Sequence, residues 1–277
     1  MRIRIDLAYD GGDFHGWAVQ PGLRTVQGDV ESALATILRV PEVSVVCAGR
    51  TDTGVHARGQ VIHTDLADGV VTASTGRSGD QPLEALVRRL NGLLPADVRV
   101  RRAVEAPPGF DARFGALWRR YAYRLVDTPA AVDPLHRSHV LVWPRPLDVG
   151  AMNEASASLL GQHDFASFCK QREGATTIRT LLELGWVRDD AGLVTATVRA
   201  DAFCHSMVRS LVGCLIAVGE GRRPAAWAED VLRAARRDPA VTVVQARGLT
   251  LEEVAYPADA GLTARAEQTR ARRDSDG

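Results

Sequence analysis

The chain has 277 residues, of which 45% are apolar and 25% charged, so it can form one large globular domain or two small ones. It has no run of 18 apolar residues, and its alternating N-terminus "MRIRIDLAYD" is unlike a signal peptide, so we expect neither a membrane span nor a leader. A formal net charge of zero and a pI of about 7.1 argue against a nucleic-acid contact over the whole surface.

The first half of the chain alternates between strand and helix patterns. In order it predicts a strand at 2–8, a helix at 25–39 capped by Thr25, strands at 43–48 and 59–66, a helix at 82–94 and a strand at 97–104. The strand at 2–8 places Ile3, Ile5 and Leu7 on one face. This βαββαβ order is that of a ferredoxin-like unit.

The second half repeats the order loosely. It predicts a strand at 118–126, a helix at 149–161, a hairpin of strands at 180–188 and 193–200, helices at 203–219 and 224–237, and a strand at 251–257. We therefore expect an α/β (α+β) protein of two ferredoxin-like βαββαβ halves, with antiparallel sheets, helices on one face and a cleft between the halves.

The expected domains are residues 1–106 and 107–262. Residues 263–277 are polar and mixed in charge, which predicts a disordered tail. Residues 68–82 are rich in Gly, Ser, Thr and Asp, which predicts a surface loop.

The cysteines and histidines offer no metal site. The four cysteines are scattered without a CxxC pair, which argues against a zinc site or a disulfide framework and suits a reducing cytoplasm. His136 and His139 have HxxH spacing, but they lie in a proline-flanked segment, so we expect no metal there.

The segment "AGRTDTGVHARGQ" (48–60) places Asp52 on a glycine-flanked turn after an apolar run. Asp-x-Gly is ordinary turn chemistry, but Gly49 and Gly54 also permit a backbone that exposes the carboxylate. Arg50 would help to hold that carboxylate ionised. The triplet "DTG" occurs in aspartic proteases too, but these need two such carboxylates and the chain has one.

Positive charge is almost entirely arginine, since Lys170 is the only lysine. Arginines cluster in one stretch, at positions 99, 101, 102, 113, 119, 120 and 124. Arginine binds phosphate in a bidentate manner, so this stretch predicts phosphate contacts, although a solvated face would look the same.

Two further patterns each allow a structural and a functional interpretation. In "WRRYAYRL", Tyr121 and Tyr123 share one face of a strand, which is typical of a half-buried core strand but also suits stacking on bases beside phosphates. His205 and Arg209 stand four apart on one face of the predicted apolar helix at 203–219. An arginine there either forms an ion pair at the helix rim or is a partner for Asp52.

The chain resembles the tRNA pseudouridine synthase A family over nearly its whole length. The matching blocks are "YDGGDFHGW" (9–17), "RTVQGDVESAL" (24–34), "AGRTDTGVHARGQVIH" (48–63), "FDARFGALWRRYAY" (110–123), "DAFCHSMVRSLVGCL" (201–215), "GL" (248–249) and "YP" (256–257). The resemblance implies a cytoplasmic, homodimeric and cofactor-free enzyme. It would isomerise uridine to pseudouridine at positions 38–40 of the tRNA anticodon stem-loop, in a cleft between two domains.

The resemblance also implies roles for single residues. The catalytic aspartate falls on Asp52, the active-site tyrosine on Tyr121 and the basic partner of the aspartate on Arg209. Expected substrate contacts are Arg50, Tyr121, Arg113, Arg119, Arg120, His205 and Leu249. Whether the carboxylate attacks C1′ or C6, or a glycal forms, stays open. The alternative is a non-catalytic RNA-binding module of two ferredoxin-like folds, which would not need Asp52.

Overall fold

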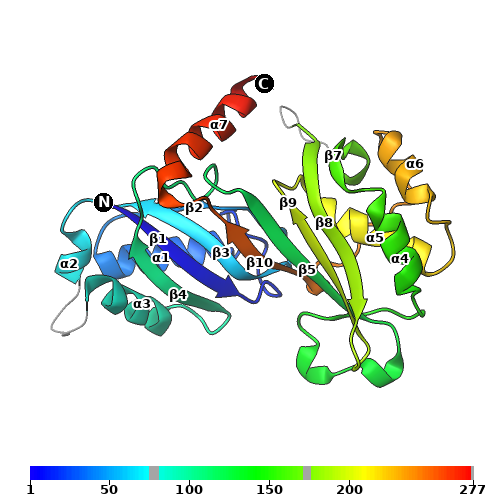
Figure 1. Cartoon of the computed structure of the whole chain (residues 1–277). Helices are drawn as coiled ribbons and strands as arrows, with labels where there is room; N and C mark the ends of the chain where they lie inside the picture. The colour runs from blue at the N-terminus through cyan, green and yellow to red at the C-terminus, as the bar shows by residue number, and fades with distance from the viewer. Residues whose placement is uncertain (75–80, 171–175, 276–277) are drawn as a thin grey trace. The chain divides into compact units, whose positions relative to one another are not determined.

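The computed structural model describes residues 1–74, 81–170 and 176–275, and it divides the chain into two compact units (Figure 1). Unit 1 comprises Met1–Leu117 and Leu251–Arg272, and unit 2 comprises Trp118–Thr250 with the residues from Arg273 onward. This division differs from the expected boundaries at 106 and 262. The physical reason is that β10 (Leu249–Ala255) pairs with β3 (His56–Asp65) of unit 1, so most of this strand belongs to unit 1 although it follows unit 2 in the sequence.

Unit 1 contains the strands and helices expected for the first half, although β2 is shorter than expected. Its elements are β1 (Arg2–Tyr9), α1 (Val26–Leu38), β2 (Val46–Cys47), β3 (His56–Asp65), α2 (Val70–Ser74), α3 (Pro82–Leu93), β4 (Val98–Glu105), and most of β10 and of α7 (Leu262–Ser275). Its strands follow the order β4-β1-β3-β10, and β2 also pairs with β3. The ladders of β1 with β3 and with β4 are antiparallel.

The core of unit 1 follows the periodicity of the sequence. Ile3, Ile5 and Leu7 are buried on one face of β1, as predicted. Helix α1 buries a single stripe, and the Thr25 hydroxyl accepts a hydrogen bond from the Gly28 N–H at 3.3 Å, which confirms the predicted cap. Helices α1, α2 and α3 pack against one another.

Unit 2 is built around the predicted hairpin. Its elements are β5 (Trp118–Val126), β6 (Leu141–Val142), α4 (Val149–Ala157), β7 (Gly161–Asp164), β8 (Ile178–Arg188), β9 (Leu193–Ala200), α5 (Met207–Gly219) and α6 (Trp227–Arg233). The strands follow the order β5-β9-β8-β7 with antiparallel ladders. β6 pairs in parallel with β5, so the sheet is not antiparallel throughout as expected.

Short 3-10 turns connect these elements. They lie at Pro129–Ala131, Pro134–His136, Ala166–Phe168, Ala246–Gly248 and Asp259–Gly261. The structure is thus a mixed α and β protein, and the assignment of each half to the ferredoxin-like fold stays a prediction.

Two segments expected to lack structure contain helix. Residues 263–277 were predicted as a disordered tail, but Leu262–Ser275 form α7, which buries Leu262 and Ala266 against unit 1. Within the predicted loop at 68–82, Val70–Ser74 form α2, and residues 75–80 lie outside the described part of the chain. Apolar contacts of a few residues stabilise these helices, although the overall composition is polar.

The cysteines differ from the expectation as well. Cys169 and Cys204 form a disulfide with their Cα atoms 5.7 Å apart, although 35 residues separate them in the sequence. The fold of unit 2 brings these two loops together, and no local spacing signals such a contact. In the described part of the chain, no helix is long and apolar enough to cross a membrane.

Candidate functional site

Asp52 lies on a tight turn between β2 and β3 of unit 1. Gly54 adopts a left-handed conformation with φ of 77°, and the Val55 N–H donates to the Asp52 carbonyl oxygen at 3.1 Å, so the backbone reverses around the aspartate. Thr51 and Val55 are buried on either side, and Asp52 itself is half-buried. The turn therefore anchors its flanks while Asp52 stays partly accessible.

The segment that follows β1 holds this turn from the other side. The Trp17 N–H donates to the Thr51 carbonyl oxygen at 3.0 Å, and the Gly54 N–H donates to the Phe14 carbonyl oxygen at 3.3 Å. A Cβ at Gly16, where φ is 91°, would lie 3.0 Å from the Thr51 carbonyl oxygen. A glycine is required at this position because its backbone is left-handed and the turn approaches closely.

Buried polar side chains fix the turn from beneath. Gln60 is fully buried, and its Nε2 donates to the Gly49 carbonyl oxygen at 2.8 Å and to the Tyr9 hydroxyl at 3.2 Å. The Tyr9 hydroxyl in turn lies 2.8 Å from Thr51 Oγ1. These hydrogen bonds reach residues on the N-terminal side of Asp52, so the carboxylate projects from a pre-organised backbone.

A histidine follows the turn directly. His56 Nδ1 accepts a hydrogen bond from the Gly11 N–H at 3.0 Å and lies 2.9 Å from Asp10 Oδ1. The histidine thereby ties the start of β3 to the segment after β1. Arg50 is exposed and forms no ion pair with any described residue. The structure thus gives no ion pair to the arginine that was expected to hold the carboxylate of Asp52 ionised.

The two tyrosines of β5 differ in their surroundings. Tyr123 is fully buried and donates its hydroxyl to the Gln245 carbonyl oxygen at 2.8 Å, and burial raises the pKa of its phenol. The Tyr121 ring packs edge-on against Phe203 with centroids 5.1 Å apart, and 7% of the residue is exposed. Tyr123 is therefore a core residue, whereas Tyr121 lies beside the loop before α5.

Arg209 lies in the first turn of α5 in unit 2. Every other residue of this helix is buried, and Arg209 is half-buried. Its Nε donates to the Val244 carbonyl oxygen at 2.7 Å. The prediction that His205 and Arg209 share one face of this helix is wrong, because α5 begins at Met207 and Ser206 adopts a left-handed φ of 64° before it. His205 is exposed on the preceding turn.

Comparison with known proteins decides the family. A model described as tRNA pseudouridine synthase matches residues 155–257. The tRNA pseudouridine synthase A of Streptomyces griseus is 60% identical over 272 residues, which cover 98% of this chain and 93% of that protein. The chain belongs to the tRNA pseudouridine synthase A family. It is thereby placed among the enzymes that form pseudouridine.

Other relatives agree with this assignment. The tRNA pseudouridine synthase A of Frankia casuarinae is 59% identical over 98% of this chain and 95% of its own length. That of Mycobacterium leprae is 51% identical over 99% of this chain and 96% of its own. A solved H/ACA ribonucleoprotein bound to a substrate RNA containing 2'-deoxyuridine aligns with 78% of this chain and 53% of its own at 9% identity, but its TM-score of 0.33 is too low to bear on the fold.

The remaining residues expected to contact substrate in this pseudouridine synthase family member lie in both units. Arg113 is exposed in unit 1, where its N–H donates to Asp111 Oδ1 at 2.8 Å. Arg119 and Arg120 are half-buried on β5, and Arg119 donates to the Asp201 carbonyl oxygen at 2.8 Å. Leu249 is buried at the start of β10.

Asp111 shapes the loop that carries Arg113. Burial alone would raise the pKa of this carboxyl, but hydrogen bonds from the Phe114 and Arg113 N–H groups, together with Arg270, bring its pKa below the usual range. Asp111 therefore supports the loop rather than acting as a proton donor. No group of three or more His, Cys, Asp or Glu side chains suited to a metal ion occurs among the described residues.

The residues that support the Asp52 turn are not among those predicted from the sequence. A weak signal for Tyr9 and Gln60 is present, because Tyr9 continues the inward face of β1 and Gln60 interrupts the apolar pattern of β3. A polar side chain on a buried face needs a hydrogen-bond partner, and here the partners belong to the turn.

We expect Tyr9→Phe to slow catalysis without weakening RNA binding. The change removes the hydroxyl that contacts Thr51 and Gln60, which costs about 1–3 kcal/mol of local stability and loosens the Asp52 turn. The expected result is a fall of about tenfold in single-turnover rate at saturating RNA, with an unchanged Kd. Tyr256→Phe is the matched control, because its hydroxyl bonds the Ala112 carbonyl oxygen instead. Equal rates for both variants would contradict a positioning role for Tyr9.

Proposed function

We propose that this protein isomerises uridine to pseudouridine at positions 38–40 in the anticodon stem-loop of tRNA, with Asp52 as the nucleophile. The observation that carries the proposal is the Asp52 turn, which hydrogen bonds hold from two sides in a chain 60% identical to a tRNA pseudouridine synthase A. Such a turn presents a carboxylate from a rigid backbone. This arrangement suits covalent catalysis at carbon.

The reaction exchanges one bond to the sugar for another. The N1–C1′ bond breaks, the C5–C1′ bond forms, C5 loses its proton and N1 gains one, so no electrons are exchanged with a cofactor. The target base cannot turn within a helical stack, so it must first be flipped out of the stack. This balance is compatible with attack by Asp52 at C1′, with attack at C6 and with a path through a glycal.

The proposal takes Asp52 from unit 1 and Tyr121 and Arg209 from unit 2. The positive charge of Arg209 would favour the ionised carboxylate of Asp52. Tyr121 would stack on the detached uracil and help to remove the C5 proton. The expected substrate contacts from Arg50, Arg113, Arg119, Arg120, His205 and Leu249 belong to the same proposal.

The resemblance to the family also supports proposals about the oligomeric state, the fold, the location and the cofactor requirement of this protein. We propose a homodimer, built from two ferredoxin-like halves with the active cleft between them, that works in the cytoplasm without a cofactor. Sedimentation of the purified protein at micromolar concentration tests the dimer directly.

Release of tritium from C5 tests the proposed function. Unmodified tRNA carrying uridine tritiated at C5 should lose one tritium for each pseudouridine formed, because C5 exchanges its hydrogen for the bond to C1′. Replacing the uridines at 38, 39 and 40 with cytidine should abolish the release. A protein that binds this tRNA tightly but releases no tritium would instead be the non-catalytic RNA-binding module.

A further inference from the structure

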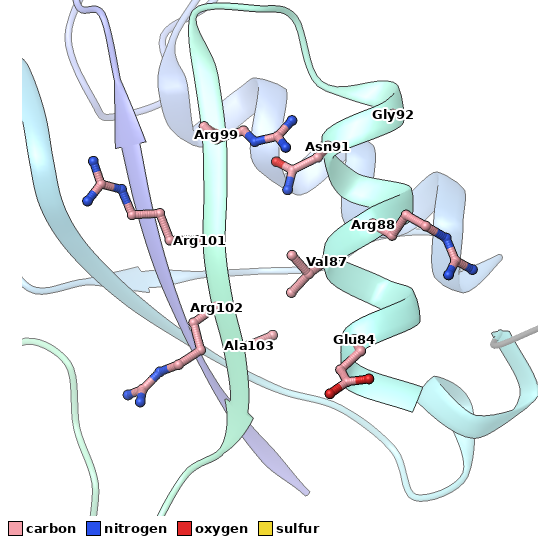
Figure 2. Close-up of a pocket in the computed structure, with 9 residues that line it drawn as sticks. All are labelled: Glu84, Val87, Arg88, Asn91, Gly92, Arg99, Arg101, Arg102 and Ala103. Atoms are coloured by element: carbon pink, nitrogen blue, oxygen red, sulfur yellow. The ribbon is translucent and has the colours of Figure 1, made fainter. Parts of the chain in front are cut away.

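A basic groove lies between α3 and β4 in unit 1 (Figure 2). It has a volume of about 530 Å³, and four arginines line it, Arg88 from α3 and Arg99, Arg101 and Arg102 from β4. Glu84 is the one acidic residue among the lining side chains. The groove is therefore strongly positive in a chain whose formal charges sum to zero.

The arrangement of β4 explains why the arginines gather here. In the ladder with β1, Leu7 pairs with Val100 and Asp6 pairs with Arg102, so Arg101 is an extra residue in a bulge. Regular alternation leaves Arg99 exposed with Val98 and Val100 in the core, and the bulge leaves Arg101 and Arg102 exposed in succession. Because β4 ends the strand order of unit 1, these side chains lie on an edge strand.

The charge at this edge is only partly compensated. Arg102 Nε lies 3.3 Å from Asp6 Oδ2. Arg99 and Arg101, by contrast, form no ion pair with any residue in the described parts of the chain. Figure 2 shows Arg99 pointing toward α3, whereas Arg101 and Arg102 project from β4 on the side away from α3. Positive charge thus surrounds β4 with little acidic compensation, which favours an external anion.

The edge is poorly suited to another protein strand. Asn91 on α3 donates from Nδ2 to the Val100 carbonyl oxygen at 2.8 Å and accepts from the Val100 N–H at 2.8 Å. The outward backbone groups of Val100 are thus already bonded, and the bulge further disrupts pairing. A second copy of the chain would bring the same arginines against these, which like charges oppose.

We propose that this groove binds phosphates of the RNA backbone outside the target uridine; this inference rests on the proposed function. Guanidinium groups bind phosphate in bidentate pairs. Tyr9 pairs with Ala57 of β3 and Val98 of β4, so Arg99 lies at the same end of the sheet as the Asp52 turn. From β3 to β4 the distance is two strand spacings, or about 10 Å. One RNA can therefore reach both the groove and Asp52.

The test replaces Arg99 and Arg101 by glutamine together. Fluorescence anisotropy with unmodified tRNA gives the Kd over a range of salt concentrations, and tritium release gives the single-turnover rate at saturating RNA. We expect the Kd to rise by about tenfold or more and the slope of log K against log salt to lose about two units. The rate at saturating RNA should stay unchanged. Arg236→Gln with Arg237→Gln removes equal charge from an exposed part of unit 2 and should leave the Kd unchanged.

Several outcomes would overturn the proposal. An unchanged Kd and slope for the folded groove variant would do so, and so would an equal loss in the control, which would indicate net charge alone. A change in sedimentation without a change in RNA affinity would show a protein interface instead. Separate measurements test the two proposals. RNA affinity and its salt dependence test the groove, whereas tritium release by the unaltered protein tests the proposed activity.

Discussion

Replacing Asp52 by asparagine should abolish pseudouridine formation, with a fall of at least about a thousandfold in single-turnover rate. Asparagine has nearly the shape of aspartate but no negative charge, so it cannot act as the nucleophile. The turn should persist, because its contacts from Trp17 and Val55 are made to backbone carbonyl oxygens. RNA affinity and Tm should therefore remain close to those of the unaltered protein.

Asp190→Asn provides the control for this variant. Asp190 is an exposed carboxylate in the turn between β8 and β9, and its replacement should leave the rate unchanged. The measurement is tritium release from C5 at saturating RNA, with thermal unfolding as the check on folding. Substantial release by folded Asp52→Asn protein would refute the nucleophile assignment and leave Asp52 with only a structural role.

Two substitutions at Tyr121 should separate its ring from its hydroxyl. Tyr121→Phe keeps the ring that packs edge-on against Phe203, so tRNA affinity should stay within about twofold. Without the hydroxyl, removal of the C5 proton loses its assistance, and turnover should fall by about a hundredfold. Tyr121→Leu should weaken both, because stacking on a base contributes about 1–3 kcal/mol.

Tyr123→Phe is the matched control on the same strand. It removes a hydroxyl that bonds the Gln245 carbonyl oxygen in the core, so it should lower Tm and leave the catalytic rate unchanged. Single-turnover rate and Kd are measured for the three variants together. If Tyr121→Phe turns over normally while Tyr121→Leu binds poorly, only the stacking role survives. Normal behaviour of both Tyr121 variants would remove this residue from the site.

Several features of this protein follow from short stretches of its sequence. The alternation of Ile3, Ile5 and Leu7 was sufficient to predict β1, because a pleated strand buries every second side chain. Thr25 and the apolar stripe after it predicted α1 and its cap in the same way. The glycines around Asp52 predicted a turn that exposes its carboxylate, since turn chemistry is local, whereas its role as nucleophile comes from the resemblance to the family and stays a prediction.

Only the tertiary structure decided what surrounds that aspartate. The Tyr9 hydroxyl contacts Thr51 at a sequence separation of 42, and Gln60 contacts Tyr9 at a separation of 51. No local pattern in the sequence therefore predicts these contacts. The same holds for the disulfide between Cys169 and Cys204 and for the pairing of β10 with β3. Propensity and periodicity act over a few neighbouring residues, whereas these partners meet only when distant segments have packed together. The sequence therefore located the proposed nucleophile, and packing between distant segments determined the support that holds its turn in place.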